Sequence, residues 1–294
     1  MNLLGQHFLK NKSAIKKIVG ALDLRAGDIA IEIGAGHGEL TLELIAYSLK
    51  LLERKQKNSE DGIKIISIEK DPRLASNLEL LTSRKNCEIE IKTGDALKLL
   101  PGLAYQLKAI SYKIVGNIPY YLTGRLLRNI SELENKPELC VLTLQKEVAQ
   151  RICAVPPKMN RLAAIIQFWA EPKIIGFIPK TDFEPLPKVD SAIIQLKTRR
   201  PNTTIIPQLR YNRSKNKKNK KGLLAAENKY YKIVKILFQQ PRKTVANNLV
   251  AALKMPRLEV EKKLKKLSIA PNLRPQDLNL EEIVKMSAVF QPQD

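Results

Sequence analysis

Hydrophobic residues in the first two thirds of the chain recur in short runs, separated by longer segments with helical spacing. The runs are 29–33, 63–68, 88–91, 113–115, 140–144, 173–178 and 191–196. Such alternation is typical of a parallel sheet with crossover helices. Only a short Pro-rich stretch separates the last two runs, so we expect them to pair antiparallel and to make the seven-stranded sheet mixed at one edge.

The pattern changes after about residue 198. The segments with apolar residues at helical spacing are 230–238, 243–253, 258–267 and 280–289. We therefore predict an α/β domain over residues 1–198 and a small α-helical domain over residues 199–294. Two polar stretches, 53–62 (ERKQKNSEDG) and 212–222 (NRSKNKKNKKG), are interpreted as loops inserted into these domains.

Composition indicates a folded protein of a cytosol-like compartment. The 294 residues are 44% hydrophobic, which is enough to bury a substantial core. The N-terminus lacks the apolar stretch of a signal peptide, and no segment approaches the roughly 18 apolar residues of a membrane helix. Cys87, Cys140 and Cys153 are odd in number and lack CxxC spacing, so neither a disulfide framework nor a metal site is predicted.

Positive charge is concentrated in the last third of the chain. Residues 197–294 contain 23 Lys and Arg against 7 Asp and Glu, which accounts for most of the net charge of +22. Such a surface attracts polyanions through counterion release, so nucleic acid is the favoured partner and an anionic membrane surface is second. A solvated surface without a partner is the structural alternative.

A glycine-rich segment that could bind a cofactor follows the first strand. There the chain reads Ile33-Gly34-Ala35-Gly36-His37-Gly38 and then becomes helical. Glycines allow a sharp turn and a close approach of the backbone to a ligand, and the next helix offers free N–H groups. The spacing differs from the GxGxxG of dinucleotide binders and from a Walker A loop, which disfavours a cofactor that contains phosphate.

Acidic residues follow the next two strands, at Glu69 and Asp95. The first is placed to accept hydrogen bonds from ribose hydroxyls, and the second from an adenine amino group. Taken singly, each is more often a helix cap or a solvated loop residue than a ligand. Together with Gly34 and Gly36, they indicate an adenosyl pocket and suggest S-adenosylmethionine.

The segment 116–121, GNIPYY, follows the fourth strand. Its residues could simply form a turn with aromatic packing. It could also hold an adenine for methylation, because the side-chain oxygen of Asn117 and the carbonyl of Ile118 could each accept one amino hydrogen. Pro119 would hold that carbonyl's direction, and Tyr120 would stack on the base.

With these motifs in order, the sequence resembles the ribosomal RNA adenine N6-dimethyltransferases that modify two adjacent adenosines near the 3′ end of small-subunit rRNA. The matching stretches cover nearly the whole chain: GQHFL (5–9), IEIGAGHGELT (31–41), IEKD (68–71), GDAL (94–97), GNIPYY (116–121), LQKEVAQR (144–151), FEPLPKVDSA (183–192) and PRKTVANNL (241–249). Each motif is modest alone, but the ordered set is specific.

The resemblance implies a Rossmann-like class I methyltransferase domain, a basic RNA-binding helical domain and S-adenosylmethionine as the cofactor. It implies that His7 and Leu9 line the methionine side of the cofactor site, and that the glycine loop contacts the cofactor by its backbone. A cytoplasmic monomer that acts on the assembling small subunit, without a metal and without a membrane, is expected.

For the remaining positions, the family implies that Glu69 binds the ribose, Asp95 binds the adenine and Asn117 lies between cofactor and target. Tyr120 would stack on the target adenine, and Phe183 would form a second aromatic wall. From the sequence pattern alone, Phe183 reads as a core residue.

Two other functions stay open from the sequence. One is the related large-subunit rRNA methyltransferase that confers antibiotic resistance, which the long basic C-terminal region disfavours. The other is a non-catalytic ribosome assembly factor, against which the retained set of Gly34, Glu69, Asp95 and Asn117 argues.

Overall fold

The computed structural model of the chain forms two compact units. It describes residues 6–54, 62–83, 85, 87–107, 110–199 and 217–290. The first unit comprises Met1–Gln150 and Glu171–Thr198, and the second comprises Arg151–Ala170 and Arg199–Asp294. Residues 151–170, which the sequence pattern assigned to the first domain, therefore group with the C-terminal helices.

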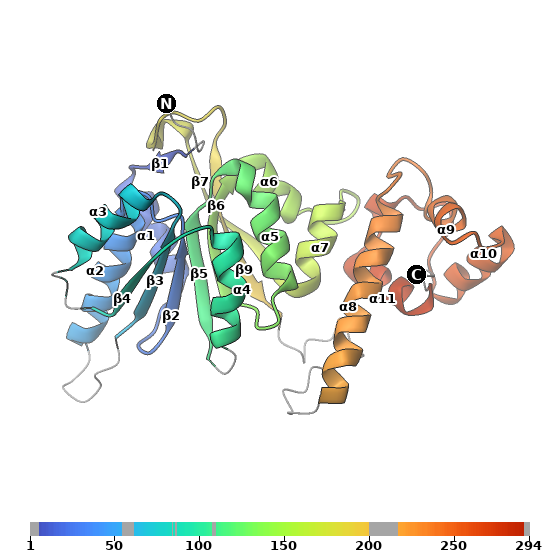
Figure 1. Ribbon diagram of the computed structural model, residues 1–294. Helices are drawn as coiled ribbons and strands as arrows, with labels where there is room; N and C mark the ends of the chain where they lie inside the picture. The colour runs from blue at the N-terminus through green and yellow to red at the C-terminus, as the bar shows by residue number, and fades with distance from the viewer. Residues whose placement is uncertain are drawn as a thin grey trace. The chain divides into compact units, whose positions relative to one another are not determined.

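A seven-stranded sheet forms the centre of the first unit (Figure 1). Its strands are β2 (Ile29–Ile33), β3 (Lys64–Glu69), β4 (Ile89–Thr93), β5 (Tyr112–Asn117), β6 (Leu139–Gln145), β7 (Ala170–Ile178) and β9 (Ser191–Thr198). Their order across the sheet is β4-β3-β2-β5-β6-β9-β7. The neighbours from β4 to β6 pair parallel, and β9 pairs antiparallel with β6, which confirms the mixed sheet.

The central strands form where the sequence is mostly apolar. All five residues of β2 are buried, as expected for a parallel strand covered on both faces. Gly116 in β5 permits a close approach to β2, because a Cβ there would lie 2.5 Å from the Ile33 carbonyl oxygen. The ends of β2 and β5 are therefore held side by side, and the glycine loop and GNIPYY both start from them.

Helices connect the strands, and three of them start at polar caps. The helices of this part of the chain are α1 (Lys12–Ala21), α2 (Glu39–Arg54), α3 (Pro72–Thr82), α4 (Ala96–Gln106), α5 (Thr123–Glu132) and α6 (Lys146–Ile152). The side chains of Asn11, Asp71 and Asp95 accept backbone hydrogen bonds at the starts of α1, α3 and α4. Side-chain acceptors at these positions satisfy N–H groups that a helix start leaves without partners.

A separate two-stranded sheet was not predicted. β1 (Phe8–Leu9) pairs antiparallel with β8 (Phe183–Glu184), so Phe8 lies opposite Glu184 and Leu9 opposite Phe183. Short 3₁₀ turns lie at Tyr120–Leu122 and Lys180–Asp182. The pairing brings the N-terminal motif to the segment between β7 and β9.

The second unit is helical, as predicted. Its helices are α7 (Arg161–Trp169), α8 (Lys217–Leu237), α9 (Val245–Leu253), α10 (Arg257–Lys266) and α11 (Leu280–Val289), with a 3₁₀ turn at Pro275–Asp277. Ala163, Ala164 and Phe168 of α7 join an apolar core with Tyr230 and Leu237 of α8. The Phe168 and Tyr230 rings stack at a centroid distance of 3.9 Å. This packing places α7 in the second unit.

The two stretches interpreted as loops are partly helical. Residues 217–222 belong to α8, so the loop prediction is wrong there, because lysine is a good helix former and no proline interrupts the stretch. Glu53 and Arg54 likewise belong to α2. The rest of these stretches, 55–61 and 212–216, lies outside the described residues.

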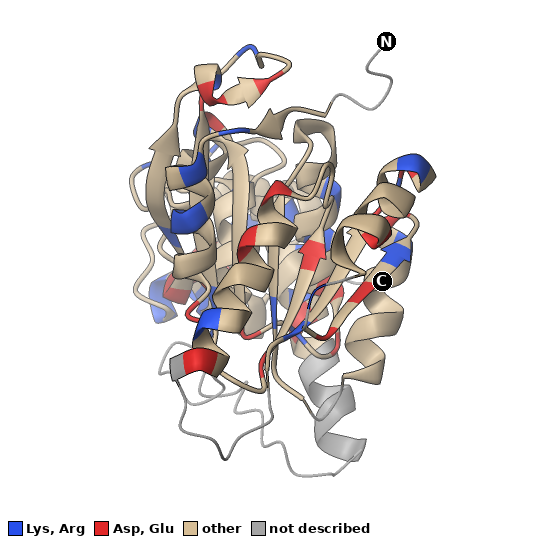
Figure 2. Ribbon diagram, turned by 90° about the vertical axis from the view of Figure 1, so that its left-hand side faces the viewer, with Lys and Arg blue, Asp and Glu red and all other residues tan. Residues whose placement is uncertain are grey.

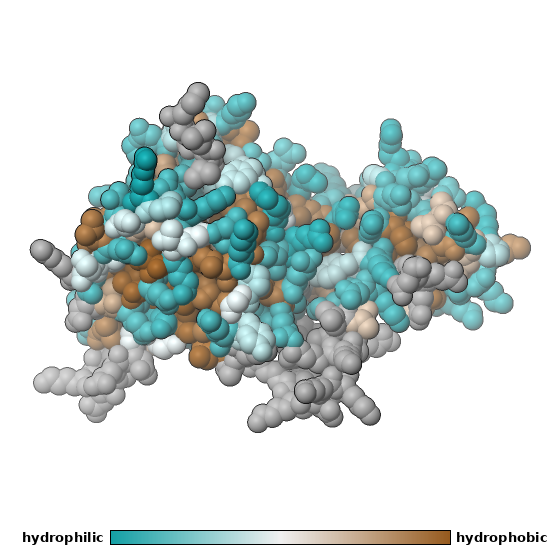
Figure 3. Space-filling view, viewed as in Figure 1, coloured by the Kyte–Doolittle hydropathy of each residue, from teal (hydrophilic) through white to brown (hydrophobic). Residues whose placement is uncertain are grey.

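The surface carries a mixture of charged, polar and apolar residues in Figures 2 and 3. Figure 2 shows residues of both charge signs on the side of the first unit that it presents. Polar and apolar residues are interspersed on the face in Figure 3. Within the described ranges, no helix is long and apolar enough to cross a membrane.

Candidate functional site

The glycine loop after β2 has a backbone that favours glycine. Gly34 and Gly36 have φ angles of +73° and +59°, in the left-handed region. A Cβ at Gly36 would also lie 2.9 Å from a ring carbon of Phe8. The loop therefore leaves its backbone open to close contact, and the Phe8 ring packs directly over Gly36.

Glu69 is buried behind this loop and holds it. One carboxylate oxygen accepts a hydrogen bond from the Gly36 N–H at 2.8 Å, and the other accepts one from the Asp71 N–H at 2.9 Å. The side chain is nearly inaccessible, at 1% exposure. Because a carboxylate oxygen has more than one acceptor site, these bonds still leave Glu69 able to accept from a ligand hydroxyl.

Asp95 lies at the neighbouring strand end. The Gly94 N–H donates to the Glu69 carbonyl at 2.8 Å, which holds the end of β4 beside that of β3. One Asp95 oxygen accepts from the Leu97 N–H at 2.9 Å, and the other lies 3.9 Å from the Lys70 ammonium. Asp95 is therefore a helix cap, with one carboxylate oxygen directed away from the cap.

Asn117 ends β5 with its amide in a defined orientation. Its Nδ2 donates a hydrogen bond to the His7 backbone carbonyl at 2.7 Å. Because a carbonyl can only accept, the amide nitrogen must face His7, and Oδ1 is the acceptor end of the side chain. A Cβ built on Gly34 would lie 3.8 Å from the Asn117 carbonyl oxygen, so the two strand ends are close neighbours.

Tyr120 stands beside Asn117 with its ring and hydroxyl both engaged. The hydroxyl shares a hydrogen bond of 2.9 Å with Ser191 Oγ, and the ring centroid lies 5.7 Å from that of His7. Burial, followed by the negative charge of Asp190, raises the pKa of the Tyr120 phenol, so it stays a neutral ring at physiological pH. Pro119 precedes it, and the Pro119 carbonyl accepts from the Leu122 N–H at 2.9 Å, which closes the turn.

The pairing of β1 with β8 positions a second aromatic residue of the hollow, Phe183. It fixes Phe183, which is 5% exposed, next to Leu9. His7 Nδ1 lies 2.6 Å from the Pro185 carbonyl oxygen and must carry a proton to donate to it. This leaves His7 Nε2 without a proton when the ring is neutral.

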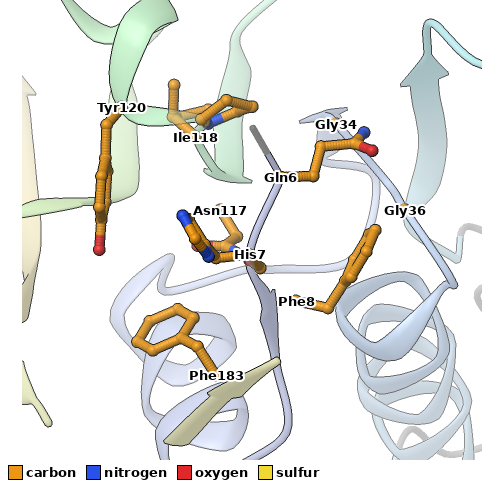
Figure 4. A pocket seen from close by; sticks show the side chains of 10 residues that line it. Gln6, His7, Phe8, Gly34, Gly36, Asn117, Ile118, Tyr120 and Phe183 are labelled. Atoms are coloured by element: carbon orange, nitrogen blue, oxygen red, sulfur yellow. The ribbon is translucent and has the colours of Figure 1, made fainter. Parts of the chain in front are cut away.

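Two adjoining hollows result. The first has about 400 Å³ of empty space, including some open to solvent, and its lining is Gln6, His7, Phe8, Gly34, Gly36, Asn117, Ile118, Pro119, Tyr120 and Phe183 (Figure 4). The second, of about 370 Å³, is lined by Phe8, Leu9, Ile15, Ile18, Gly34, Ala35, Gly36, Glu39, Leu40 and Asn117. In Figure 4 the Tyr120, His7 and Phe183 rings lie on one side, and Phe8 points toward Gly36.

The structure thus brings most of the predicted site residues together, but it places His7 and Leu9, which were expected to line one site, in different hollows. His7, Pro119, Tyr120 and Phe183 line the first hollow, whereas Leu9 lines the second. The two hollows share Gly34, Gly36 and Asn117. Glu69 and Asp95 line neither, and Glu69 connects to them through its bond to the Gly36 N–H.

The sequence reasoning missed three residues of this region. Phe8 and Ser191 lie within the recognised motifs GQHFL and FEPLPKVDSA, but their partners are far away in the chain. Glu32 lies in β2, fully buried, and accepts hydrogen bonds from Thr41 and Ser67. An acidic residue inside an otherwise apolar strand was the available signal for Glu32.

The same region lacks the features of a metal site. Among the residues that the structure describes, no group of three or more His, Cys, Asp or Glu is placed to hold a metal ion. None of the three cysteines forms a disulfide.

Comparison with known proteins identifies relatives over the whole chain. Residues 2–291 match the family model described as Ribosomal RNA adenine dimethylase. Ribosomal RNA small subunit methyltransferase A of Dehalococcoides mccartyi is 32% identical over 288 residues, covering 98% of this chain and 87% of that protein. The protein of the same name from Campylobacter hominis is 33% identical, with 94% and 90% covered.

Solved structures show the same fold. A dimethyladenosine transferase from Plasmodium falciparum superposes with a TM-score of 0.71 at 22% identity, with 97% of both chains covered. The 23S rRNA methyltransferase ErmE superposes with a TM-score of 0.65 at 23% identity, covering 96% of this chain and 99% of its own. The first unit has a Rossmann-like class I methyltransferase fold, and it is followed by a small helical unit.

Proposed function

The chain belongs to the ribosomal RNA adenine dimethylase family, and from this membership we propose that it methylates N6 of two adjacent adenosines near the 3′ end of small-subunit rRNA. The methyl donor in this proposal is S-adenosylmethionine, which supplies an electrophilic sulfonium methyl group when bound. The observation that supports the proposal is the orientation of Asn117, whose amide nitrogen bonds to the His7 carbonyl while the residue lines the same hollow as Tyr120.

The residues around the glycine loop fit an adenosyl cofactor. The left-handed backbone of Gly34 and Gly36 lets a ligand approach closely, and a cofactor lying against Gly36 would take the place of the Phe8 ring. Glu69 would accept from the ribose hydroxyls and Asp95 from the adenine amine. Leu9 would face the methionine part, because it lines the second hollow with both glycines.

The first hollow would hold the target adenine. Tyr120 would stack on the base, Phe183 would form a second aromatic wall, and the base must leave its own stack to enter. Asn117 Oδ1 and the Ile118 carbonyl would accept the two amino hydrogens, with Pro119 fixing the direction of that carbonyl. Holding both hydrogens favours a pyramidal nitrogen whose lone pair points toward the donor.

His7 would act on the target side rather than on the methionine side. Its ring lines the hollow with Tyr120 and Phe183, and its backbone carbonyl orients the Asn117 amide. No strong base is required, because a sulfonium is an activated donor and the proton can leave after transfer.

The remaining attributes are part of the same proposal. Residues 1–198 would carry the reaction, and the basic helical region 199–294 would bind rRNA through its lysines and arginines. We expect the protein to act in the cytoplasm as a monomer, on the small subunit during its assembly. The small-subunit substrate is favoured over the large-subunit one because the relatives above 30% identity carry the small-subunit name over nearly their full length.

The test is methylation of undermethylated small subunits, read by mass spectrometry of the rRNA. Asn117→Ala and Tyr120→Ala should each abolish turnover, whereas Tyr105→Ala, which changes an exposed tyrosine near the end of α4, should not. Undiminished methylation by both site variants would rule out this site. Calorimetry with S-adenosylmethionine separates the non-catalytic assembly factor, which would bind none.

A further inference from the structure

An exposed aromatic side chain lies outside the hollow, near the carboxyl end of β7. Phe177 is 54% exposed, and two other apolar residues of the following segment, Leu186 and Val189, are 59% and 43% exposed. Burial of the Phe177 ring against a partner would be stabilising, and the groups beside the ring decide which kind of partner it fits.

A short series of contacts connects Phe177 to the proposed stacking residue. The Tyr120 hydroxyl bonds to Ser191, which follows Asp190 in the chain. The carbonyl of Asp190 accepts from the Lys146 N–H at 3.0 Å. The Lys146 ammonium in turn lies 5.2 Å from the centroid of the Phe177 ring. Phe177 is therefore near the hollow but separate from its lining.

The positive charge beside Phe177 is accessible. The Lys146 ammonium lies 3.9 Å from the Asp190 carboxylate, and both side chains are 44% exposed, so the pair is a weak one. Lys180 and Lys188 are exposed on the same segment. An ammonium group over an exposed ring, with two more exposed lysines on the same segment, matches the combination that binds unpaired nucleic acid, in which lysines contact phosphates and a ring stacks on a base.

The acidic side chains of this segment do not cancel that charge. Glu184 forms an ion pair with Lys10, and Asp182 accepts a hydrogen bond from the Asn11 side chain. Asp190 is the remaining carboxylate, and the Lys180 N–H donates to it at 3.1 Å. Four lysines, Lys10, Lys146, Lys180 and Lys188, stand against three carboxylates, so the segment keeps a net positive charge, which favours a polyanion over an acidic protein.

We propose that Phe177, with Lys146, forms a platform on which an unpaired nucleotide of the RNA substrate stacks beside the flipped target adenosine. The proposal rests on the proposed function, because it assigns a second RNA contact to the same reaction. Stacking is tolerant of base identity, since every base has a π face. The platform would hold the strand next to the target while the target base occupies the first hollow.

The test measures binding and turnover separately, with the full chain. Binding of a short fluorescent single-stranded oligoadenylate is followed by anisotropy for the wild type, Phe177→Ala, Phe177→Trp and Tyr105→Ala. Phe177→Ala should weaken binding about 5- to 150-fold, the range expected for loss of one base–aromatic stack. Phe177→Trp should retain binding, and Tyr105→Ala, another exposed aromatic of the first unit, should match the wild type.

Turnover on undermethylated small subunits completes the test. Phe177→Ala should raise KM for the subunit and leave kcat and S-adenosylmethionine affinity near the wild-type values. Oligoadenylate binding that is absent from the wild type, or equal in Phe177→Ala, overturns the platform. So does a defect seen with whole subunits but not with naked rRNA, because that would assign Phe177 to a protein partner. If no variant methylates any rRNA, the proposed function fails, while the anisotropy still decides the platform.

Discussion

The buried carboxyl group of Glu32 should make the stability of the protein depend on pH, by an amount that follows from its surroundings. The side chain is fully buried, and one carboxylate oxygen accepts hydrogen bonds of 2.6 Å from both Thr41 and Ser67. The other oxygen has no hydrogen-bond partner among the described residues. Burial raises the pKa of Glu32 from its ordinary 4.5 to about 7, against the lowering effect of the two hydroxyls.

This pKa makes the free energy of unfolding depend on pH. Between pH 4.5 and 7 the folded protein holds a proton that the unfolded chain has released. The stabilisation is therefore fully present below about pH 4.5 and is lost as the pH rises through about 7. The difference between the two pKa values of Glu32 corresponds to a loss of about 3 kcal/mol in the free energy of unfolding as the carboxyl group ionises. Roughly 2 kcal/mol of this loss falls between pH 5 and pH 8.

The perturbation is Glu32→Gln, which keeps an acceptor oxygen and removes the ionisation. We expect the variant to gain stability relative to the wild type by roughly 2 kcal/mol on going from pH 5 to pH 8. Urea unfolding followed by circular dichroism at both pH values measures this, and Glu90→Gln, an exposed glutamate of β4, is the matched control. An equal difference between Glu32→Gln and the wild type at the two pH values would refute the reasoning.

Two further predictions concern the residues of the site, and a third concerns rRNA binding by the basic region. Gly36→Ala should cost about 1–2 kcal/mol from its left-handed backbone alone and should weaken S-adenosylmethionine binding in calorimetry, because the new methyl would meet Phe8 at 2.9 Å. Gly20→Ala, in α1 with nothing within 4 Å of the added carbon, is its control, and equal cofactor affinity in the two variants would contradict close contact of the cofactor with Gly36. Tyr120→Phe keeps the ring and loses the bond to Ser191, so we expect methylation to fall by no more than about tenfold, the effect of one hydrogen bond; a loss as complete as that of Tyr120→Ala would show that the hydroxyl, not stacking, is essential. The affinity for small-subunit rRNA should fall linearly on a log–log plot against salt, by about 0.7–0.9 per phosphate contacted, and a flat line in a filter-binding titration would argue against the electrostatic role of the basic region.

The local pattern of hydrophobic and polar residues is sufficient to predict the secondary structure and several residues of the site. The seven strands and the four C-terminal helices follow from hydrophobic periodicity, which depends only on neighbours in the chain. The glycine loop, Glu69, Asp95 and Asn117 could be assigned to one edge of the sheet, because parallel strands end on the same side. The resemblance to a family came from the ordered motifs, and the family match confirms it.

Contacts between distant residues were decided by the tertiary structure alone. The β1–β8 pairing, the bond from Asn117 to the His7 carbonyl and the bond from the Gly36 N–H to Glu69 join residues whose separation no periodicity encodes. The sequence named His7 as a site residue, but only the folded chain places its ring on the side of Tyr120 and away from Leu9.

Burial shows the same division between sequence and structure. An apolar run predicts a strand equally well for Ile178, which is buried, and for Phe177, which is exposed, because exposure depends on what packs against each side chain. Residues 151–170 were likewise assigned to the first domain from the sequence, whereas the apolar core around Phe168 and Tyr230 groups them with the second unit. The sequence by itself determined the secondary structure and the chemical groups available, whereas packing decided which of those groups meet.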